Sequence, residues 1–398
     1  MDALLQDILW RDHDPDVPGT CGTPGCSKAA TTRCIECYQH QPLCRECTSE
    51  RHRNLPLHWV EVWNGRYFKR TDLSALGLEI HLEHRGECCP HATLDSPARD
   101  FVIAHHNGVH QCKVRYCFCP TSPKPLSQLV RAGFFPPTVD RMETAFTLEV
   151  LDDYILDFDI SKKSAQDYWR RLVRKTNDSL RALTTVLQDR YRQFMRAARV
   201  FRYLVMLKRS GIALGVVFPY RDPKSVVFPC LICPWPKVNL LRGWRDVPAF
   251  LRFLFRHVES MDGNYGMYHK LKAADINDVP LTDGQGVFMG SQRLLELTEK
   301  WEEACKTVAE CLYFLQEYLC NDFKVRRTQR VGKFKSKDIS GIISAVCNHI
   351  TFTFGATLNL ITTETYVFSV LELTVSGLMR LSATFSWTAV QPPPSTVR

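Results

Sequence analysis

The sequence predicts an α+β fold divided into several small domains, and three observations support this class. Seventeen cysteines are present, and eleven of them lie within the first 119 residues, in pairs with histidines between them. Residues 142–212 carry apolar side chains at helical spacing, whereas residues 213–350 alternate short apolar runs with helical patterns. No stretch approaches the ~20 uninterrupted apolar residues of a membrane helix, so we expect no membrane partner.

Changes in composition divide the chain into six segments. In order, they are an acidic leader, a Cys/His-rich region of short strands and loops, a proline-rich connection, a basic helical segment, a mixed α/β domain and a divergent tail: residues 1–20, 21–119, 120–141, 142–212, 213–350 and 351–398. The leader lacks the basic-then-apolar order of a signal peptide, so we expect a reducing compartment. There, paired Cys and His at short spacing indicate metal more often than disulfides.

The basic helical segment holds most of the formal net charge of +9. Residues 161–210 contain fourteen Lys or Arg against three Asp, and apolar side chains recur every three or four positions on the opposite face. Asp178 and Asp189 are candidate N-caps, and Gly211 is a candidate helix stop. The pattern predicts amphipathic helices with a basic outer face.

A second basic block, Lys324–Lys337, has seven basic residues and no acidic ones. Such concentration indicates a polyanionic partner, with nucleic acid the leading candidate, while the alternative is a solvated helix face. The side chains expected to contact phosphates come from both blocks: Arg170, Arg171, Arg174, Lys175, Arg192, Arg196, Arg199, Arg202, Lys208, Arg209, Arg326, Arg327 and Arg330.

The first cysteine cluster contains eight candidate ligands in four closely spaced pairs: Cys21, Cys26, Cys34, Cys37, Cys44, Cys47, His52 and His58. Zinc takes four tetrahedral N or S ligands, so four pairs make two complete sites. With pairs this close, an interleaved arrangement is the natural closure: the first and third pairs form one site, and the second and fourth form the other. The spacing resembles a B-box type cross-brace, in which both zinc ions are structural because no coordination position stays open.

Two further clusters follow with wider spacing. We prefer His84, Cys89, Cys117 and Cys119 as one set, with His110 as a substitute, while the alternative is unligated surface histidines. Farther along, Cys230-x2-Cys233 lies in a proline-rich loop, and its partners come from about 90 residues away: Cys320, Cys347 and His349.

The order of short motifs over residues 20–350 resembles the cysteine-cluster domain and following domain of the Kyakuja–Dileera–Zisupton (KDZ) class of DNA transposases. The motifs are His52–Leu57, Trp63-Asn64-Gly65, Leu76-Gly77-Leu78, Gly108-Val109-His110, Cys117-x-Cys119, Asp189-Arg-Tyr-Arg-Gln-Phe, Leu207-Lys-Arg, Cys230-x2-Cys233-Pro, Asn239-Leu240, Gly243-Trp244, Met261–Tyr265, Asp283-Gly284, Cys320-x2-Phe323-Lys324, Ser340-Gly341 and Cys347-x-His349.

The resemblance implies an RNase H-like α/β domain over residues 213–350, in which three carboxylates hold two Mg²⁺ ions. Asp262 matches the first carboxylate and follows the apolar run Phe253–Val258, which would be the first strand. The family's second aspartate lies in a Tyr-Asp-x2-Cys run, and no Tyr-Asp occurs after Asp262. Because one acid cannot position two metals, we expect an incomplete catalytic domain, and Mg²⁺ only if that domain were complete.

Three hypotheses for function follow. The first is a transposase-derived nuclear protein that binds zinc and DNA without catalysis. The second is a zinc scaffold for protein interaction of the B-box-like kind, although long heptads do not follow the cluster. The third is an active metal-dependent DNA transposase, for which Asp262 would be indispensable. Protein partners are possible under each, and the sequence sets no oligomeric state.

Overall fold

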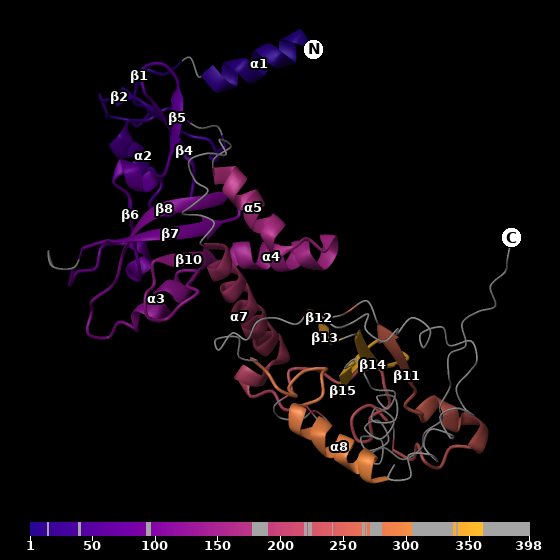
Figure 1. Cartoon of the computed structure of the whole chain (residues 1–398). Helices are drawn as coiled ribbons and strands as arrows, with labels where there is room; N and C mark the ends of the chain where they lie inside the picture. The colour runs from indigo at the N-terminus through magenta and orange to yellow at the C-terminus, as the bar shows by residue number, and fades with distance from the viewer. Residues whose placement is uncertain are drawn as a thin grey trace. The chain divides into compact units, whose positions relative to one another are not determined.

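In the computed structural model the chain divides into two compact units, residues 1–202 and 203–398 (Figure 1). The residues that the structure describes are 1–13, 16–38, 41–92, 97–176, 190–218, 221, 225–240, 242–264, 267, 269–270, 281–304, 337–339 and 341–360. Both units mix helices with strands, so the predicted α+β class is confirmed.

The chain begins with a helix and a small set of antiparallel strands. Their bounds are α1 (Asp2–His13), β1 (Gly19–Thr20), β2 (Ala29–Ala30), β3 (Thr32–Cys34), α2 (Arg45–Arg51), β4 (Val60–Trp63) and β5 (Phe68–Thr71). Val60 lies in the central strand of sheet β3-β4-β5, paired with Cys34 on one side and Thr71 on the other, and is fully buried. Strand pairing therefore places Cys34 beside Val60 and close to His58, which precedes Val60 by two residues.

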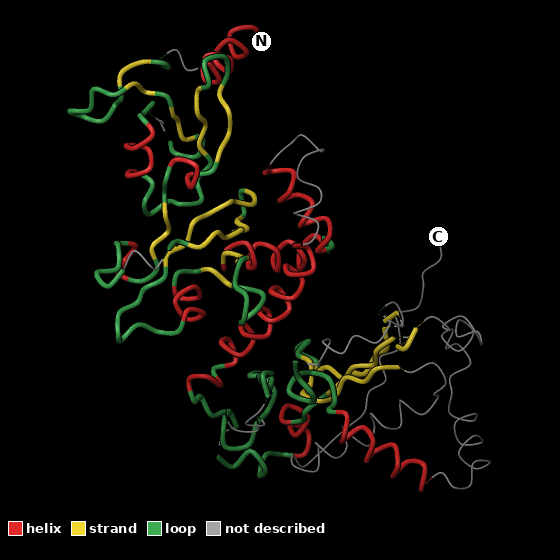
Figure 2. The backbone as a smooth tube through the Cα atoms, turned by 60° about the vertical axis from the view of Figure 1, so that its left-hand side comes forward, coloured by secondary structure: helices red, strands yellow, loops and turns green. Residues whose placement is uncertain are grey.

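A five-stranded mixed sheet forms the centre of the first unit (Figure 2). The strands of this sheet and the short helices next to them in the chain have these bounds: η1 (Leu73–Leu76), β6 (Glu79–His81), η2 (His84–Gly86), β7 (Arg99–His105), β8 (Gly108–Arg115), α3 (Pro125–Arg131), β9 (Phe134–Phe135) and β10 (Thr144–Thr147). The strand order is β6-β8-β7-β10-β9, with β6 parallel to β8 and β10 parallel to β7. Phe101, Ile103, Val114 and Leu129 make its core. The sheet takes strands from three of the segments delimited by composition.

Three helices complete the first unit: α4 (Leu148–Ser161), α5 (Ala165–Thr176) and α7 (Arg190–Ser210), the last of which runs on into the second unit. The ring of Phe194 stacks on Tyr168 at 5.7 Å and on Trp169 at 5.6 Å, and it meets Tyr154 edge-on at 5.0 Å. These apolar faces are the stripe predicted from the sequence. The proposed caps Asp178 and Asp189 lie outside the described residues. Within those residues, no helix combines the length and apolar character needed to cross a membrane.

The second unit contains a three-stranded antiparallel sheet, β11-β14-β15. The bounds of its elements are η3 (Ile212–Leu214), η4 (Ala249–Phe255), β11 (Glu259–Asn264), β12 (His269–Lys270), α8 (Ser291–Ala304), β13 (Lys337–Ile339), β14 (Gly341–Cys347) and β15 (Phe352–Leu360). The strand predicted at Phe253–Val258 is wrong: η4 runs to Phe255, and the strand begins at Glu259. The apolar run lacks the two-residue alternation of a strand, and Pro248 starts a helical turn.

Candidate metal centres

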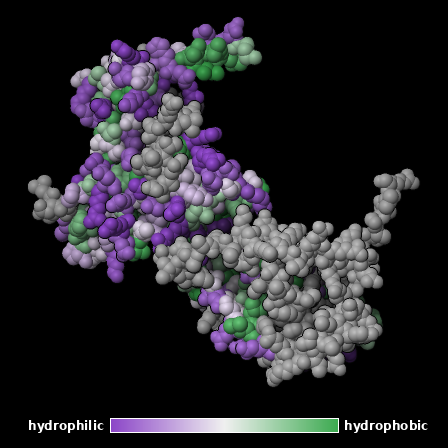
Figure 3. Space-filling model, viewed as in Figure 1, coloured by the Kyte–Doolittle hydropathy of each residue, from purple (hydrophilic) through white to green (hydrophobic). Residues whose placement is uncertain are grey.

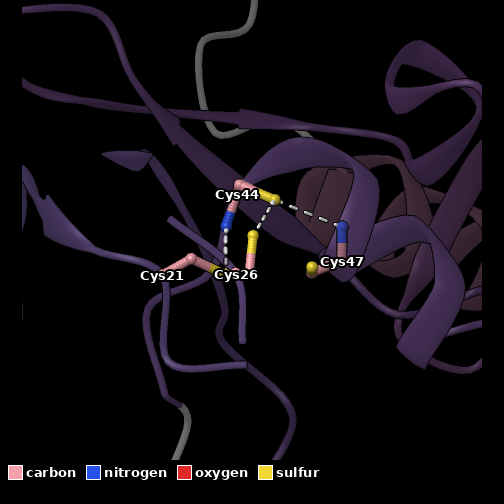
Figure 4. Close-up of side chains that lie close together, drawn as sticks. All are labelled: Cys21, Cys26, Cys44 and Cys47. Carbon is pink, nitrogen blue, oxygen red and sulfur yellow. Dashed lines mark hydrogen bonds between the residues drawn. The ribbon is translucent and has the colours of Figure 1, made fainter. Parts of the chain in front are cut away.

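The first centre consists of four cysteines around the start of α2 (Figure 4). Cys44 is the N-cap of α2, and its sulfur accepts the backbone N–H of Cys47 at 3.5 Å. Cys44 in turn donates its own N–H to the sulfur of Cys21 at 3.3 Å, and the Cys26 and Cys44 sulfurs are 3.9 Å apart. A tetrahedron with metal–sulfur bonds of about 2.3 Å has edges of about 3.8 Å. The distance between the Cys26 and Cys44 sulfurs matches such an edge, and all four sulfurs lie within 4.8 Å of one another, so they could hold one metal ion.

The second centre joins Cys34 and Cys37 to two histidines. The Cys37 sulfur is 3.4 Å from Nε2 of His52, and the Cys34 sulfur is 3.5 Å from Nδ1 of His58. Nδ1 of His52 lies 2.8 Å from the carbonyl oxygen of Thr48, so this nitrogen carries the proton and Nε2 presents a lone pair. Burial lowers the pKa of His52, which keeps its imidazole neutral, as a metal ligand must be.

The third centre gathers His84, Cys89, Cys117 and Cys119, which is the set preferred from the sequence. The Cys89 sulfur is 3.8 Å from each of the other two sulfurs, and Nε2 of His84 is 3.2 Å from the Cys117 sulfur. Nδ1 of His91 lies 3.3 Å from the Cys119 sulfur, so a fifth nitrogen or sulfur group lies beside this centre.

The backbone around His84 is strained. Glu83, His84 and Arg85 have φ values of 63°, 45° and 56°, a region that costs side-chain-bearing residues of order 1 kcal/mol each. Such a run persists only where other interactions hold it, and a metal bond to His84 would be one of them. The strain is therefore consistent with a bound ion.

Gln128 supports this third centre and was missed from the sequence. It lies on α3, is 2% exposed, and accepts the N–H of Cys117 at 2.8 Å. Its amide nitrogen donates to the carbonyl oxygens of Cys117 at 3.0 Å and Pro123 at 2.9 Å. Two of these three side-chain hydrogen bonds thus hold the backbone of Cys117, the first residue of the Cys117-x-Cys119 loop. A glutamine on the apolar face of a helix just after that loop was the available signal.

The fourth centre lies in the second unit and brings Cys230, Cys233, Cys347 and His349 together. The three cysteines are buried, and the Cys233 sulfur is 3.4 Å from Nδ1 of His349. Trp235 packs on the cluster and donates its indole N–H to the carbonyl oxygen of Cys230 at 2.7 Å. Cys320, the other predicted ligand, lies outside the described residues. The four gathered groups complete a tetrahedral set without it.

The thiols of the metal-free chain differ in acidity. Burial raises the pKa of Cys21, but hydrogen bonds, led by the backbone N–H of Cys44, outweigh it and bring the pKa to about 6. The Phe118 N–H lowers the pKa of Cys89 to about 6, whereas burial and the neighbouring sulfurs raise that of Cys119 to about 12. Cys21 in the first centre and Cys89 in the third are thus thiolates near pH 7, and a cation arriving at either centre displaces the protons of the remaining thiols.

His110, the substitute ligand, is not part of any of these centres. It is 1% exposed, stacks on Trp59 at 4.0 Å, and holds Asp72 at 3.1 Å through Nδ1. Its Nε2 lies 2.9 Å from Oδ1 of Asn107, whose amide nitrogen donates to Glu36 at 2.6 Å. Because Glu36 stands between two ligands of the second centre, this chain of contacts ties that centre to the five-stranded sheet.

The predicted phosphate-contacting residues have different surroundings. Arg170, Arg174, Lys175, Arg192, Arg196, Arg199, Arg202, Lys208 and Arg209 are exposed. Arg171 is half-buried and pairs with Asp153 at 2.7 Å and Asp157 at 3.4 Å, so its charge is already balanced. Arg202 stacks over Phe158 at 4.6 Å. Arg326, Arg327 and Arg330 lie outside the described residues.

Asp262, the predicted catalytic acid, is exposed in the interior of β11, where it pairs with Ser344. Its Oδ1 accepts the backbone N–H of Gly263 at 2.7 Å. In the part of the chain that the structure describes, the metal-binding groups do not include Asp262.

One segment of the chain matches a known protein family. Residues 73–179 match a family model described as "CxC2 like cysteine cluster associated with KDZ transposases". No curated protein and no solved structure matches the chain. The matched segment contains the five-stranded sheet, all four residues of the third centre and the basic helix α5. The relation to KDZ transposases stated from the sequence motifs is thereby confirmed for this segment.

Proposed function

We propose that this chain, whose residues 73–179 are a KDZ-transposase-associated cysteine cluster, is a zinc-stabilised DNA-binding protein that acts in the nucleus. One observation carries the proposal. Helix α5 buries Tyr168, Trp169 and Leu172 against the unit's core and presents Arg170, Arg174 and Lys175 to solvent. The helix thus has a fixed orientation and a basic outer face inside the family-matched segment.

Zinc is the metal proposed for the four cysteine centres. Thiolate and imidazole ligands in sets of four favour zinc, and a complete set leaves no position for a substrate. The role proposed is structural, because segments as small as residues 21–58 bury too little apolar surface to fold alone. Each centre also joins residues far apart in the sequence, from Cys21 to Cys47 and from Cys230 to His349.

The arrangement of α5 favours phosphate contact over a merely solvated face. Its C-terminal end is fixed to two sheets. Thr176 accepts the N–H of Val109 in the five-stranded sheet at 2.8 Å, and Arg70 in sheet β3-β4-β5 donates to the carbonyl oxygen of Lys175 at 2.7 Å. Because the backbone that carries this basic surface is already ordered, contact with a polyanion adds little cost for ordering the backbone. Arg192 and Arg196 on α7 add a second exposed basic stretch.

Fluorescence anisotropy of the full zinc-loaded chain with duplex DNA tests the proposal. We expect binding near 50 mM salt that weakens steeply as salt rises, with a slope of about 0.9 per phosphate neutralised. The variant R170E/R174E should lower affinity at least tenfold and reduce that slope by about 2.

The control variant R131E/R141E makes the same change in net charge at exposed positions on other elements. It should retain most of the affinity if the α5 face is the contact surface. Binding that is absent at about 50 mM salt, or equally strong at about 500 mM, contradicts the proposal, as does equal loss in the two variants.

A second candidate, a zinc scaffold for protein interaction, is favoured by one feature. Helix α1 exposes Leu5, Ile8, Leu9 and Trp10 by 50–66%, and its apolar atoms lie at the surface in Figure 3. Patches of this kind often mark protein contacts. This candidate predicts a DNA-independent complex that L5D/L9D abolishes, whereas the DNA-binding proposal predicts that L5D/L9D leaves DNA affinity unchanged.

Catalysis is not part of the proposal. Among the described residues, Asp262 belongs to no group of three or more candidate metal ligands, and a two-metal reaction needs several carboxylates. Mg²⁺-dependent nicking of DNA that Asp262→Ala abolishes would require a catalytic function to be added.

A further inference from the structure

Two histidines and a glutamate converge at one edge of the five-stranded sheet, and none of the three belongs to the four cysteine centres. Nδ1 of His105 is 3.5 Å and Nδ1 of His106 is 3.8 Å from Oε2 of Glu149. One ligand atom from each of the three residues lies within 4.8 Å of the others. The edges of a tetrahedral site with bonds of about 2.0–2.1 Å measure about 3.3–3.4 Å, so small side-chain movements suffice to close it.

The fold itself creates this juxtaposition. Strands β7 and β10 run parallel with Ala104 beside Phe146, so they end at the same edge of the sheet. His105 ends β7, and Thr147 ends β10 and caps α4, whose first turn carries Glu149. Lys175 donates to the carbonyl oxygen of His106 at 2.8 Å, and this hydrogen bond holds the turn that carries the His106 ring.

We infer that His105, His106 and Glu149 bind one divalent transition-metal ion, at a site distinct from the four cysteine centres. Two imidazoles and one carboxylate suit zinc, nickel or cobalt, and the set contains no thiolate. Three protein ligands leave at least one coordination position for water or for an oxygen of an anionic ligand. The His106 and Glu149 side chains are 55% and 72% exposed, so an ion reaches the site directly from solvent.

Three local interactions set the affinity below that of the cysteine centres. The Thr147 hydroxyl lies 3.0 Å from Nδ1 of His105, and a metal on that nitrogen displaces this hydrogen bond. The Lys175 ammonium is nearby, and it repels a cation. Glu149 also interacts favourably with the N-terminus of α4 when no metal is bound. The site is therefore an exchangeable one, which releases its ion to chelators that leave the thiolate centres filled.

Titration of the full chain with Co²⁺, after its cysteine centres are filled with zinc, tests the inference without DNA. Cobalt held by nitrogen and oxygen gives weak visible bands, whereas cobalt held by thiolate adds an intense charge-transfer band. We expect one equivalent to bind with weak bands only. Glu149→Gln and His106→Gln should each weaken that binding about tenfold or more.

Glu143→Gln is the matched control, because Glu143 is an exposed glutamate in the same region, and it should bind cobalt like the unaltered chain. Retention of the cysteine-bound zinc in every variant shows that the fold is intact. The inference is overturned by charge-transfer absorption alone, by no binding beyond the cysteine centres, or by binding that both substitutions leave unchanged. Because no DNA is present, its failure is separate from failure of the proposed function.

Discussion

Asn107 links the second metal centre to the five-stranded sheet, and its replacement by alanine removes three hydrogen bonds of this link at once. Its amide nitrogen donates to Glu36 at 2.6 Å and to the carbonyl oxygen of Leu57 at 2.8 Å. Its Oδ1 accepts Nε2 of His110 at 2.9 Å, and its backbone oxygen accepts the indole N–H of Trp59 at 3.1 Å. Asn107→Ala removes the first three bonds and leaves the last in place.

The expected loss of folding free energy depends on the groups that Asn107→Ala leaves without a hydrogen-bond partner. A net hydrogen bond contributes about 1 kcal/mol, and a buried group left without a partner costs about 1–3 kcal/mol. His110 and Leu57 are buried, whereas the bond to the exposed Glu36 carboxylate is screened by water and counts at the low end. The sum is about 2–4 kcal/mol, a large share of the 5–15 kcal/mol that stabilises a typical domain.

Hydrogen–deuterium exchange of zinc-loaded protein measures this loss where it occurs. Amides of β8 (Gly108–Arg115) should exchange at least about tenfold faster in Asn107→Ala, since 1.4 kcal/mol corresponds to a factor of ten. Asn54→Ala, at an exposed asparagine, is the control and should change exchange little.

A double-mutant cycle with Glu36→Ala isolates the link itself. We expect a coupling free energy of about 1 kcal/mol between Glu36 and Asn107, because the two share a direct hydrogen bond. Exchange rates in Asn107→Ala that equal those of the Asn54 control, or fully additive effects in the cycle, would refute the coupling between the metal centre and the sheet.

Three further predictions concern the centres and the helices. Gln128→Leu should lower zinc affinity of the third centre about 10–100-fold in chelator competition, because the Cys117-x-Cys119 loop loses its support; unchanged affinity contradicts the role given to Gln128. Phe194→Ala should cost about 3–5 kcal/mol in urea unfolding, because its ring is fully buried among four aromatic residues, whereas the half-buried Phe158→Ala should cost clearly less. Acidification below the ordinary histidine pKa of about 6.5 should release zinc progressively, since protons compete for imidazoles and thiolates; zinc retained at about pH 3 would count against these ligands.

The ligand sets were accessible from the sequence because short chelating loops restrict their own geometry. Cys34 and Cys37 must lie within one turn of each other, and only a few ways of combining four such pairs are sterically simple. The structure brings together the interleaved sets inferred from that spacing, and it also joins Cys230 to His349 across more than a hundred residues. The apolar stripe of α5 and α7 was accessible for a similar reason, since it depends on local period alone.

The supporting residues were not accessible, because their roles depend on tertiary contacts. Nothing in the local sequence distinguishes Asn107 from a surface amide until β7 and β8 are in place. The position of Gln128 on an apolar helix face is a signal, but it does not show which backbone groups the amide binds until α3 packs beside the Cys117-x-Cys119 loop. His110 failed as a ligand for the same reason: the register of β8 points it at Trp59 and Asp72 rather than at the third centre. The strand predicted at Phe253–Val258 was wrong because a run of apolar residues does not by itself distinguish a helical turn from a strand.

Native mass spectrometry of the full chain, purified in reductant and dialysed against a weak chelator, counts the metal ions that the cysteine centres hold. The four cysteine centres predict four zinc ions per chain, with the exchangeable histidine–glutamate site emptied by the dialysis. Removal of all four by a strong chelator should unfold the first unit, as seen by loss of its exchange protection. A chain that carries no zinc, or that keeps its protection after the metal is removed, would contradict the account.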